Sequence, residues 1–242
     1  MPDRLVRRIA GGAVAVLAVF AALLTTGATP AAGYGPAAPT LTDNVWGGYV
    51  ATGSGFSSIV GSWTEPDATC TSTQDLYAPW VGIDGYGSQT VEQTGVETNC
   101  DSGSPEYRGW YEIYPAAPVY WNDPVAPGDV ITGKVVAQGG GSYDITLTDE
   151  TAGWTEHTVQ SIGGENVSAE AVIESPTGSY PSFDRLDFSG ITVNGQVFDT
   201  YSPVGIDSGG YVPGPLSNGA FSMAPGGARA DHAHHVTGPV RY

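Results

Sequence analysis

The stretch Leu186-Asp-Phe-Ser-Gly-Ile-Thr-Val-Asn-Gly-Gln-Val-Phe-Asp-Thr-Tyr201 places two β-favouring runs on either side of the pair Asn194-Gly195. An Asn-Gly pair in this setting is a strong hairpin signal, because both residues tolerate the positive φ angles of a tight two-residue turn. We therefore expect antiparallel strands at 186–193 and 196–201.

The same pattern of short β-type runs separated by turn residues continues on the N-terminal side of this hairpin. Gly, Pro, Asn, Asp and Ser fill the connections and favour turns. The 35 Gly and 18 Pro residues, against two Met, disfavour a helical bundle, and no helical period is sustained. The further strands are expected at 46–51, 57–64, 77–83, 108–114, 130–137, 142–149, 155–161 and 168–174, with a last one near 220–223. This arrangement predicts an all-β domain, either a sandwich or a closed barrel.

The N-terminus has the order of a secretory signal peptide: a basic start, an uncharged apolar run at 10–24 and then small residues. The apolar run has 15 residues, whereas a membrane-spanning helix needs about 20. We expect a signal peptide at 1–32, a flexible lead-in at 33–44, one β-sandwich domain at 45–225 and a flexible tail at 226–242. The protein is expected to be extracellular. The tail contains His232, His234 and His235, which we interpret as part of an exposed segment.

The chain is strongly acidic, with 8 Lys+Arg and 25 Asp+Glu. Without residues 1–32, which hold three Arg and one Asp, 5 basic and 24 acidic residues remain. Such a surface disfavours nucleic acid, which is bound through Lys and Arg. It suits an acidic medium, where many carboxylates lose their charge and repel one another less. We expect a monomer with no nucleic-acid or membrane partner once the signal peptide is removed.

The two cysteines, Cys70 and Cys100, both lie in the exported part. Because oxidising compartments permit disulfides, we expect them to be paired. No His lies near either one, so neither a metal site nor a cofactor is expected.

Three of the expected strands carry acids beside aromatic or small residues on one face, since alternate residues of a strand share a face. These faces comprise Trp80, Gly82 and Asp84, then Trp110, Glu112 and Tyr114, and then Glu170, Val172 and Glu174. Ala169, Ala171 and Ile173 fall on the opposite face of the last strand and would serve the core. Spacing alone leaves two interpretations open: an acidic, aromatic-lined cleft, or ordinary solvent-facing acids.

Other catalytic classes fit poorly. His157 is the one His in the body of the domain, and no Gly-x-Ser-x-Gly elbow, phosphate loop or dinucleotide fingerprint occurs. Of the catalytic classes considered, catalysis by carboxylates is the one that remains.

Five motifs occur in the order and spacing typical of one family. They are Trp46-Gly-Gly48, Trp80-Val-Gly-Ile-Asp-Gly85, Gln93-Thr-Gly95, Trp110-Tyr-Glu-Ile-Tyr-Pro115 and Ala169-Glu-Ala-Val-Ile-Glu174. Together they resemble the glutamic peptidases (eqolisins, peptidase family G1). The resemblance implies two packed antiparallel sheets in a jelly-roll or concanavalin-like sandwich. It also implies acid-acting endopeptidase activity on proteins and peptides, insensitive to the usual inhibitor of aspartic peptidases.

The resemblance assigns the catalytic pair to Gln93 and Glu174 and the lining of the substrate cleft to Asp84, Trp110 and Glu112, to which we add Trp46 and Glu170. A glutamate can act as general base and then as general acid, and an amide N–H can stabilise an oxyanion. Glu170 is the rival base; it lies on the same face as Glu174, at roughly 13 Å for four residues of strand.

The chain also departs from the family pattern. The short lead-in at 33–44 resembles bacterial members, because fungal members carry an inhibitory pro-segment there. Arg108 stands where the best-known members have an acid, and Ile113 stands where many have Trp. The Arg108 departure therefore bears on the charge of the cleft and on its substrate preference.

Two other functions remain open from the sequence. A carbohydrate-binding sandwich would use Trp46, Trp80, Trp110 and Trp121 as stacking platforms. A glycosidase would use two of Asp84, Glu112 and Glu174 across one bond.

Overall fold

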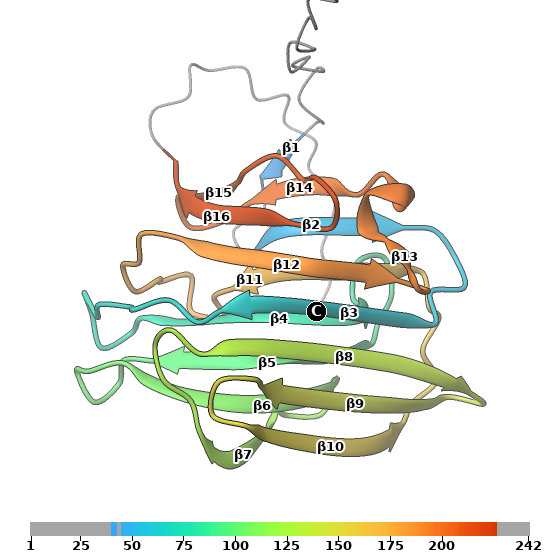
Figure 1. Cartoon of the computed structure of the whole chain (residues 1–242), viewed down its shortest axis with the longest axis horizontal. Coiled ribbons are helices and arrows are strands. Elements are labelled where there is room, and N and C mark those ends of the chain that lie inside the picture. The colour runs from blue at the N-terminus through green and yellow to red at the C-terminus, as the bar shows by residue number, and fades with distance from the viewer. Residues whose placement is uncertain (1–39, 43–44, 227–242) are drawn as a thin grey trace, which may run out of the picture. The chain divides into compact units, whose positions relative to one another are not determined.

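The structure, a computed structural model, describes residues 40–42 and 45–226. Two sheets pack face to face in this part of the chain, which confirms the all-β sandwich (Figure 1). Pairing is antiparallel except between β1 and β14. Sheet A runs in the order β1 (Thr40–Thr42), β14 (Val204–Asp207), β2 (Trp46–Thr52), β11 (Ser168–Glu174), β4 (Leu76–Asp84), β5 (Val91–Asn99), β6 (Glu106–Tyr114), β7 (Val119–Pro124). Sheet B runs in the order β10 (Trp154–Ser161), β9 (Ser142–Asp149), β8 (Val130–Gly139), β3 (Ser58–Thr64), β12 (Leu186–Val193), β16 (Phe221–Pro225), β15 (Tyr211–Pro213), with β13 (Gln196–Val197) paired to β12.

The expected hairpin forms at Asn194-Gly195, where φ is 49° and 72°. The strand expected over 196–201 is wrong beyond Val197, because a 3-10 helix, η1 (Phe198–Tyr201), follows β13. Phe198 is fully buried there, and the Asp199 carboxylate accepts the backbone N–H groups of Asn218 and Gly219. Burial of the Phe198 ring and the hydrogen bonds between Asp199 and the 218–219 loop therefore stabilise the 3-10 helix more than continued strand pairing would.

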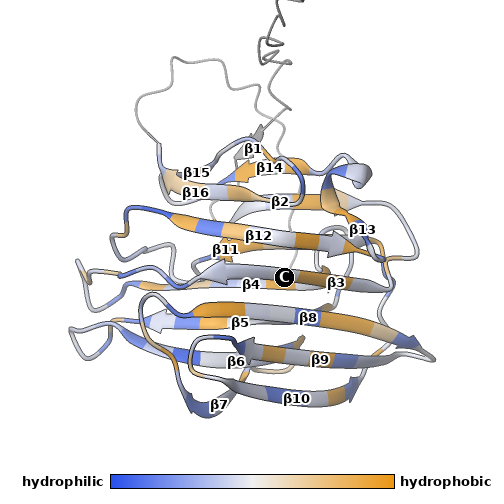
Figure 2. Ribbon diagram, viewed as in Figure 1, coloured by the Kyte–Doolittle hydropathy of each residue, from blue (hydrophilic) through white to orange (hydrophobic). Residues whose placement is uncertain are grey.

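Strand β11 shows how alternation builds the two layers. Ala169, Ala171 and Ile173 belong to the large core between the sheets, whereas Val172 belongs to a second cluster on the other face of sheet A. Figure 2 shows the same alternation of hydrophobic and polar residues along the strands. The expected division of this strand into a core face and an outer face is confirmed.

Several strands were not expected from the sequence: β1, β5, β7, β14 and β15. β1 lies within the range expected to be lead-in. The expected signal peptide at 1–32 and the His-containing end of the tail at 227–242 lie outside the described residues. Within the part of the chain that the structure describes, no helix has the length and apolarity needed to cross a membrane.

The disulfide between Cys70 and Cys100 is present, with 5.7 Å between the two Cα atoms. The bridge ties the end of β5 to the segment before β4, and the Cys100 N–H also donates to the Asp75 carbonyl. It therefore fixes one end of the central strands of sheet A.

Acidic side chains are buried inside this fold. Glu65 and Glu92 are essentially inaccessible to solvent. Burial raises the pKa of each to about 8, and for Glu92 the nearby charge of Asp84 adds to the shift. These groups are therefore protonated in the folded protein at acidic and neutral pH.

We expect folding stability to fall as pH rises from about 4.5 to about 8. In that window the folded state keeps a proton on Glu92 that the unfolded state has released, so each pH unit costs up to about 1.4 kcal/mol for this one group. Glu92→Gln removes the ionisation, and its melting temperature should fall less than that of wild type between pH 5 and pH 8. Glu150→Gln, at an exposed position, is the matched control. Parallel curves for Glu92→Gln and wild type would contradict the assignment.

Candidate active site

Gln93 and Glu112 stand directly opposite each other on neighbouring strands, β5 and β6. The Gln93 Nε2 donates a hydrogen bond of 2.6 Å to Glu112 Oε2. Gly82 lies opposite Gln93 on the other side, on β4, and adds no side chain to this row. The amide is thus held in a fixed orientation on the outer face of sheet A.

Glu174 ends strand β11 and is positioned by an indole. Val172 lies opposite Trp80 and Glu174 opposite Ala78, so Trp80 and Glu174 share one face. The Trp80 Nε1 donates a hydrogen bond of 3.0 Å to Glu174 Oε2. Because Trp80 is fully buried, it is a rigid support for this carboxylate.

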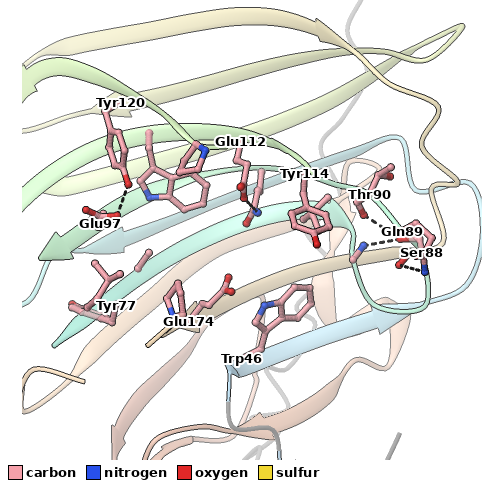
Figure 3. A pocket seen from close by; sticks show the side chains of 18 residues that line it. Trp46, Tyr77, Ser88, Gln89, Thr90, Glu97, Glu112, Tyr114, Tyr120 and Glu174 are labelled. Atoms are coloured by element: carbon pink, nitrogen blue, oxygen red, sulfur yellow. Dashed lines mark hydrogen bonds between the residues drawn. The ribbon is translucent and has the colours of Figure 1, made fainter. Parts of the chain in front are cut away.

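Gln93 and Glu174 both face one cleft on sheet A, with a cavity volume of about 380 Å³. Figure 3 shows the labelled Glu112, Glu174, Trp46 and Tyr114 around the same hollow. The cleft is lined by Trp46, Leu76, Tyr77, Ala78, Gly85, Ser88, Gln89, Thr90, Val91, Gln93, Glu97, Trp110, Glu112, Tyr114, Pro118, Tyr120, Glu174 and Pro176. The wall is largely aromatic and apolar, with few polar groups, as in many ligand sites.

Burial raises the pKa of Glu112 to about 7, although the hydrogen bond from Gln93 works in the opposite direction. Glu112 is therefore uncharged in acid. A neutral carboxyl can still accept the Gln93 N–H through its carbonyl oxygen.

Asp84 does not line the cleft, contrary to the expectation. Its φ of 69° breaks the strand alternation, so its carboxylate turns to a loop instead. The two oxygens accept the backbone N–H groups of Glu165, Asn166 and Val167, each at 2.8 Å. Asp84 is an anchor for the loop before β11.

Glu170 also lies away from the cleft, although it shares a face with Glu174. Its side chain is fully buried, and burial raises its pKa well above the usual range.

The Trp46 indole reaches from β2 across β11 to Gly85, where any Cβ would lie 2.6 Å from the ring. Gly85, with φ of 97°, is the residue that admits this ring.

The tryptophans do not offer stacking platforms for a sugar. Trp46, Trp80 and Trp110 are only 2%, 0% and 6% exposed, and Trp121 packs against the core. Glu112 and Glu174 both line the cleft, but the Gln93 amide is hydrogen-bonded to Glu112, which a simple pair of catalytic acids does not require. Both observations disfavour the carbohydrate alternatives.

Some cleft features were not anticipated. Gln93 lies on a strand whose polar residues are buried on both faces, so the period-2 signal is absent. Glu97 and Tyr120 line the cleft, and no pattern in the sequence singled them out. The pairing of Trp80 with Glu174 joins residues that are 94 positions apart.

A model of the Peptidase A4 family matches residues 44–210. The chain belongs to this family. The glutamic peptidase resemblance drawn from the ordered motifs is thereby confirmed.

Among curated proteins, the chain is 28% identical over 190 residues to aspergillopepsin-2 of Aspergillus niger, covering 66% of each chain. It is 30% identical over 166 residues to scytalidopepsin B of Scytalidium lignicola, covering 65% of this chain and 59% of that relative. The chain thus spans a little under two thirds of the length of these relatives.

Solved structures show the same fold. The structure of scytalido-glutamic peptidase with a transition state analog inhibitor superposes with a TM-score of 0.66 at 22% identity, covering 76% of this chain and 98% of that one. The structure of SCP-B, described as an eqolisin in complex with the tripeptide Ala-Ile-His, superposes with a TM-score of 0.61 at 22% identity and the same coverage.

We expect Asp84→Asn to lower the free energy of unfolding by about 2–3 kcal/mol, because an amide NH₂ would face a backbone N–H that the carboxylate now accepts. Chemical denaturation of the variant and wild type measures this. Asp67→Asn, at an exposed position, is the control and should be close to neutral. Equal unfolding free energies for Asp84→Asn and wild type would show that the loop does not depend on this carboxylate.

Proposed function

We propose that this chain is an exported endopeptidase that hydrolyses peptide bonds of proteins in acid, with Gln93 and Glu174 as the catalytic pair. The observation that carries the proposal is that these two side chains line one cleft, while the rival Glu170 is buried outside its lining. Membership of the Peptidase A4 family supports the reaction class.

In the first step, the Glu174 carboxylate takes a proton from a water molecule as the water oxygen attacks the scissile carbonyl carbon. The hydrogen bond from the Trp80 indole N–H to Glu174 Oε2 orients this carboxylate at the cleft, where the attacking water would lie. A fixed carboxylate lowers the entropic cost of reaching the reactive geometry.

Attack converts the carbonyl oxygen to an oxyanion. The Gln93 amide has two N–H groups, and its bond to Glu112 uses one of them. The second N–H can donate to the oxyanion. Such a preoriented donor typically lowers the activation barrier by about 3–4 kcal/mol.

The tetrahedral intermediate then collapses. The C–N bond breaks, the carbonyl re-forms and Glu174 returns its proton to the leaving nitrogen. The products are a carboxylic acid and an amine, and Glu174 is again ionised. One carboxyl group therefore serves as base and then as acid.

Glu112 favours operation in acid. Below its pKa of about 7 it carries no charge and does not oppose the developing oxyanion near Gln93. As pH rises through about 7, Glu112 ionises and its negative charge opposes that oxyanion. Activity should therefore decline across this range.

Export is supported by the signal-peptide pattern of residues 1–32 and by the Cys70–Cys100 disulfide. Disulfides persist mainly in oxidising compartments. The two features are independent of the catalytic assignment.

We expect Glu174→Gln to lower kcat for a denatured protein substrate at pH 3–4 by at least 10³-fold, because the amide cannot take a proton from water. Gln93→Ala should lower kcat by about 10²–10³-fold through loss of the oxyanion donor. Both variants should bind a peptide substrate and show thermal unfolding in acid similar to wild type.

Glu170→Gln is the matched control, since it makes the same substitution four residues away on the same strand. It should keep kcat within a few fold of wild type. If Glu174→Gln turned over substrate at the wild-type rate, the assignment of Glu174 as the base would be wrong. Loss of turnover in Glu170→Gln with the fold intact would contradict it as well.

A further inference from the structure

A second polar cluster lies at one end of the cleft and consists of Glu97, Arg108 and Tyr120. The Tyr120 hydroxyl donates a hydrogen bond to Glu97 Oε2, and the Arg108 guanidinium lies 3.7 Å from Glu97 Oε1. The guanidinium carbon also lies 4.9 Å from the centre of the Tyr120 ring. Figure 3 shows Tyr120 and Glu97 joined at the end of the cleft away from the Ser88–Thr90 loop.

The strand register places this cluster next to Glu174. Glu174 lies opposite Ala78 on β4. The pairs Tyr77 with Thr98 and Trp80 with Gly95 put Ala78 in turn opposite Glu97 on β5. Glu97 and Glu174 are therefore two strands apart, roughly 10 Å between backbones, on either side of a small residue. The short Ala78 side chain leaves a hollow between the two carboxylates.

The walls and the charge of this hollow indicate what it would hold. Trp110 and Tyr120 line this part of the cleft with largely apolar rings. Glu97 is the charged group at its far side, with a side chain only 13% exposed, and Arg108 compensates that charge. The Glu97 side of the hollow is thus close to neutral although the chain as a whole is strongly acidic.

We propose that this hollow accepts a substrate side chain next to the scissile bond, and that Arg108 makes it selective for uncharged side chains by neutralising Glu97. The proposal rests on the peptidase function proposed above. Arg108 does not line the cleft itself, so it acts through Glu97 and determines specificity without touching the reacting atoms.

Tyr120 keeps Glu97 in this position. Burial, and then the neighbouring Glu97 carboxylate, raise the pKa of Tyr120, so its hydroxyl remains a donor at every working pH. Removing either the Glu97 or the Arg108 charge should therefore leave the other charge uncompensated beside the substrate. Arg108→Met leaves an uncompensated carboxylate, and Glu97→Gln leaves an uncompensated guanidinium.

The test uses peptides that carry norleucine, lysine or cysteic acid at one of the two positions flanking the scissile bond. Lysine and norleucine have similar length, and cysteic acid keeps its negative charge in acid. Arg108→Met should raise the lysine-to-norleucine ratio of kcat/KM by about tenfold at one of these positions, because a charge-assisted hydrogen bond becomes available. Glu97→Gln should raise the ratio of cysteic acid to norleucine by a similar factor at the same position.

Two further variants separate charge from structure. Arg108→Lys keeps the positive charge and should retain the wild-type ratios. Arg185→Met removes an exposed arginine paired with Asp187, outside the cleft, and should also leave them unchanged. Because the readout is a ratio within each variant, loss of stability alone does not mimic the expected result.

Unchanged ratios in both Arg108→Met and Glu97→Gln, with norleucine peptides still cleaved, would overturn the subsite and leave the peptidase function standing. Absence of cleavage by wild type at any acidic pH would overturn the peptidase function, and the subsite with it.

Discussion

The position of β11 between β2 and β4 is the constraint on which the candidate site depends. This placement sets Val172 opposite Trp80, and the Trp80 indole then donates to Glu174. The same strand carries Glu170, four residues earlier on the same face, but the Glu170 side chain is fully buried. One strand therefore contributes two glutamates with different environments: a carboxylate at a cleft that accepts the Trp80 N–H, and a buried carboxyl whose pKa is raised by burial. Environment, and not residue type, distinguishes the two, which is a general route by which proteins assign acid and base roles.

The burial of acids links the fold to the conditions in which it works. Glu65, Glu92 and Glu170 are enclosed, and burial raises the pKa of each. A neutral buried carboxyl costs far less free energy than a buried charge. Acidic surroundings therefore favour both the folded state and the uncharged form of Glu112 in the cleft. Stability and the proposed chemistry depend on pH in the same direction, through different residues.

Much of this architecture could be predicted from the sequence, and the failures have physical causes. Alternation identified the β11 faces, and Asn194-Gly195 identified a real hairpin. Alternation of apolar and polar residues did not reveal β5, because that strand is buried on both faces and carries polar residues on each. Parity placed Asp84 in the cleft, but a positive φ turned its side chain to a loop. The cluster of Glu97, Arg108 and Tyr120 could not be found, since it depends on register between strands and on the reach of long side chains. Strand type is a local property, whereas these features are tertiary.

Degradation of a denatured protein measured from pH 2 to pH 7, with and without an inhibitor of aspartic peptidases, tests the central claim most directly. A glutamate-activated water with an amide oxyanion donor predicts proteolysis confined to acid and unaffected by the inhibitor. Proteolysis abolished by the inhibitor, or none at any pH from folded protein, would contradict the assignment of this cleft as a glutamic peptidase site.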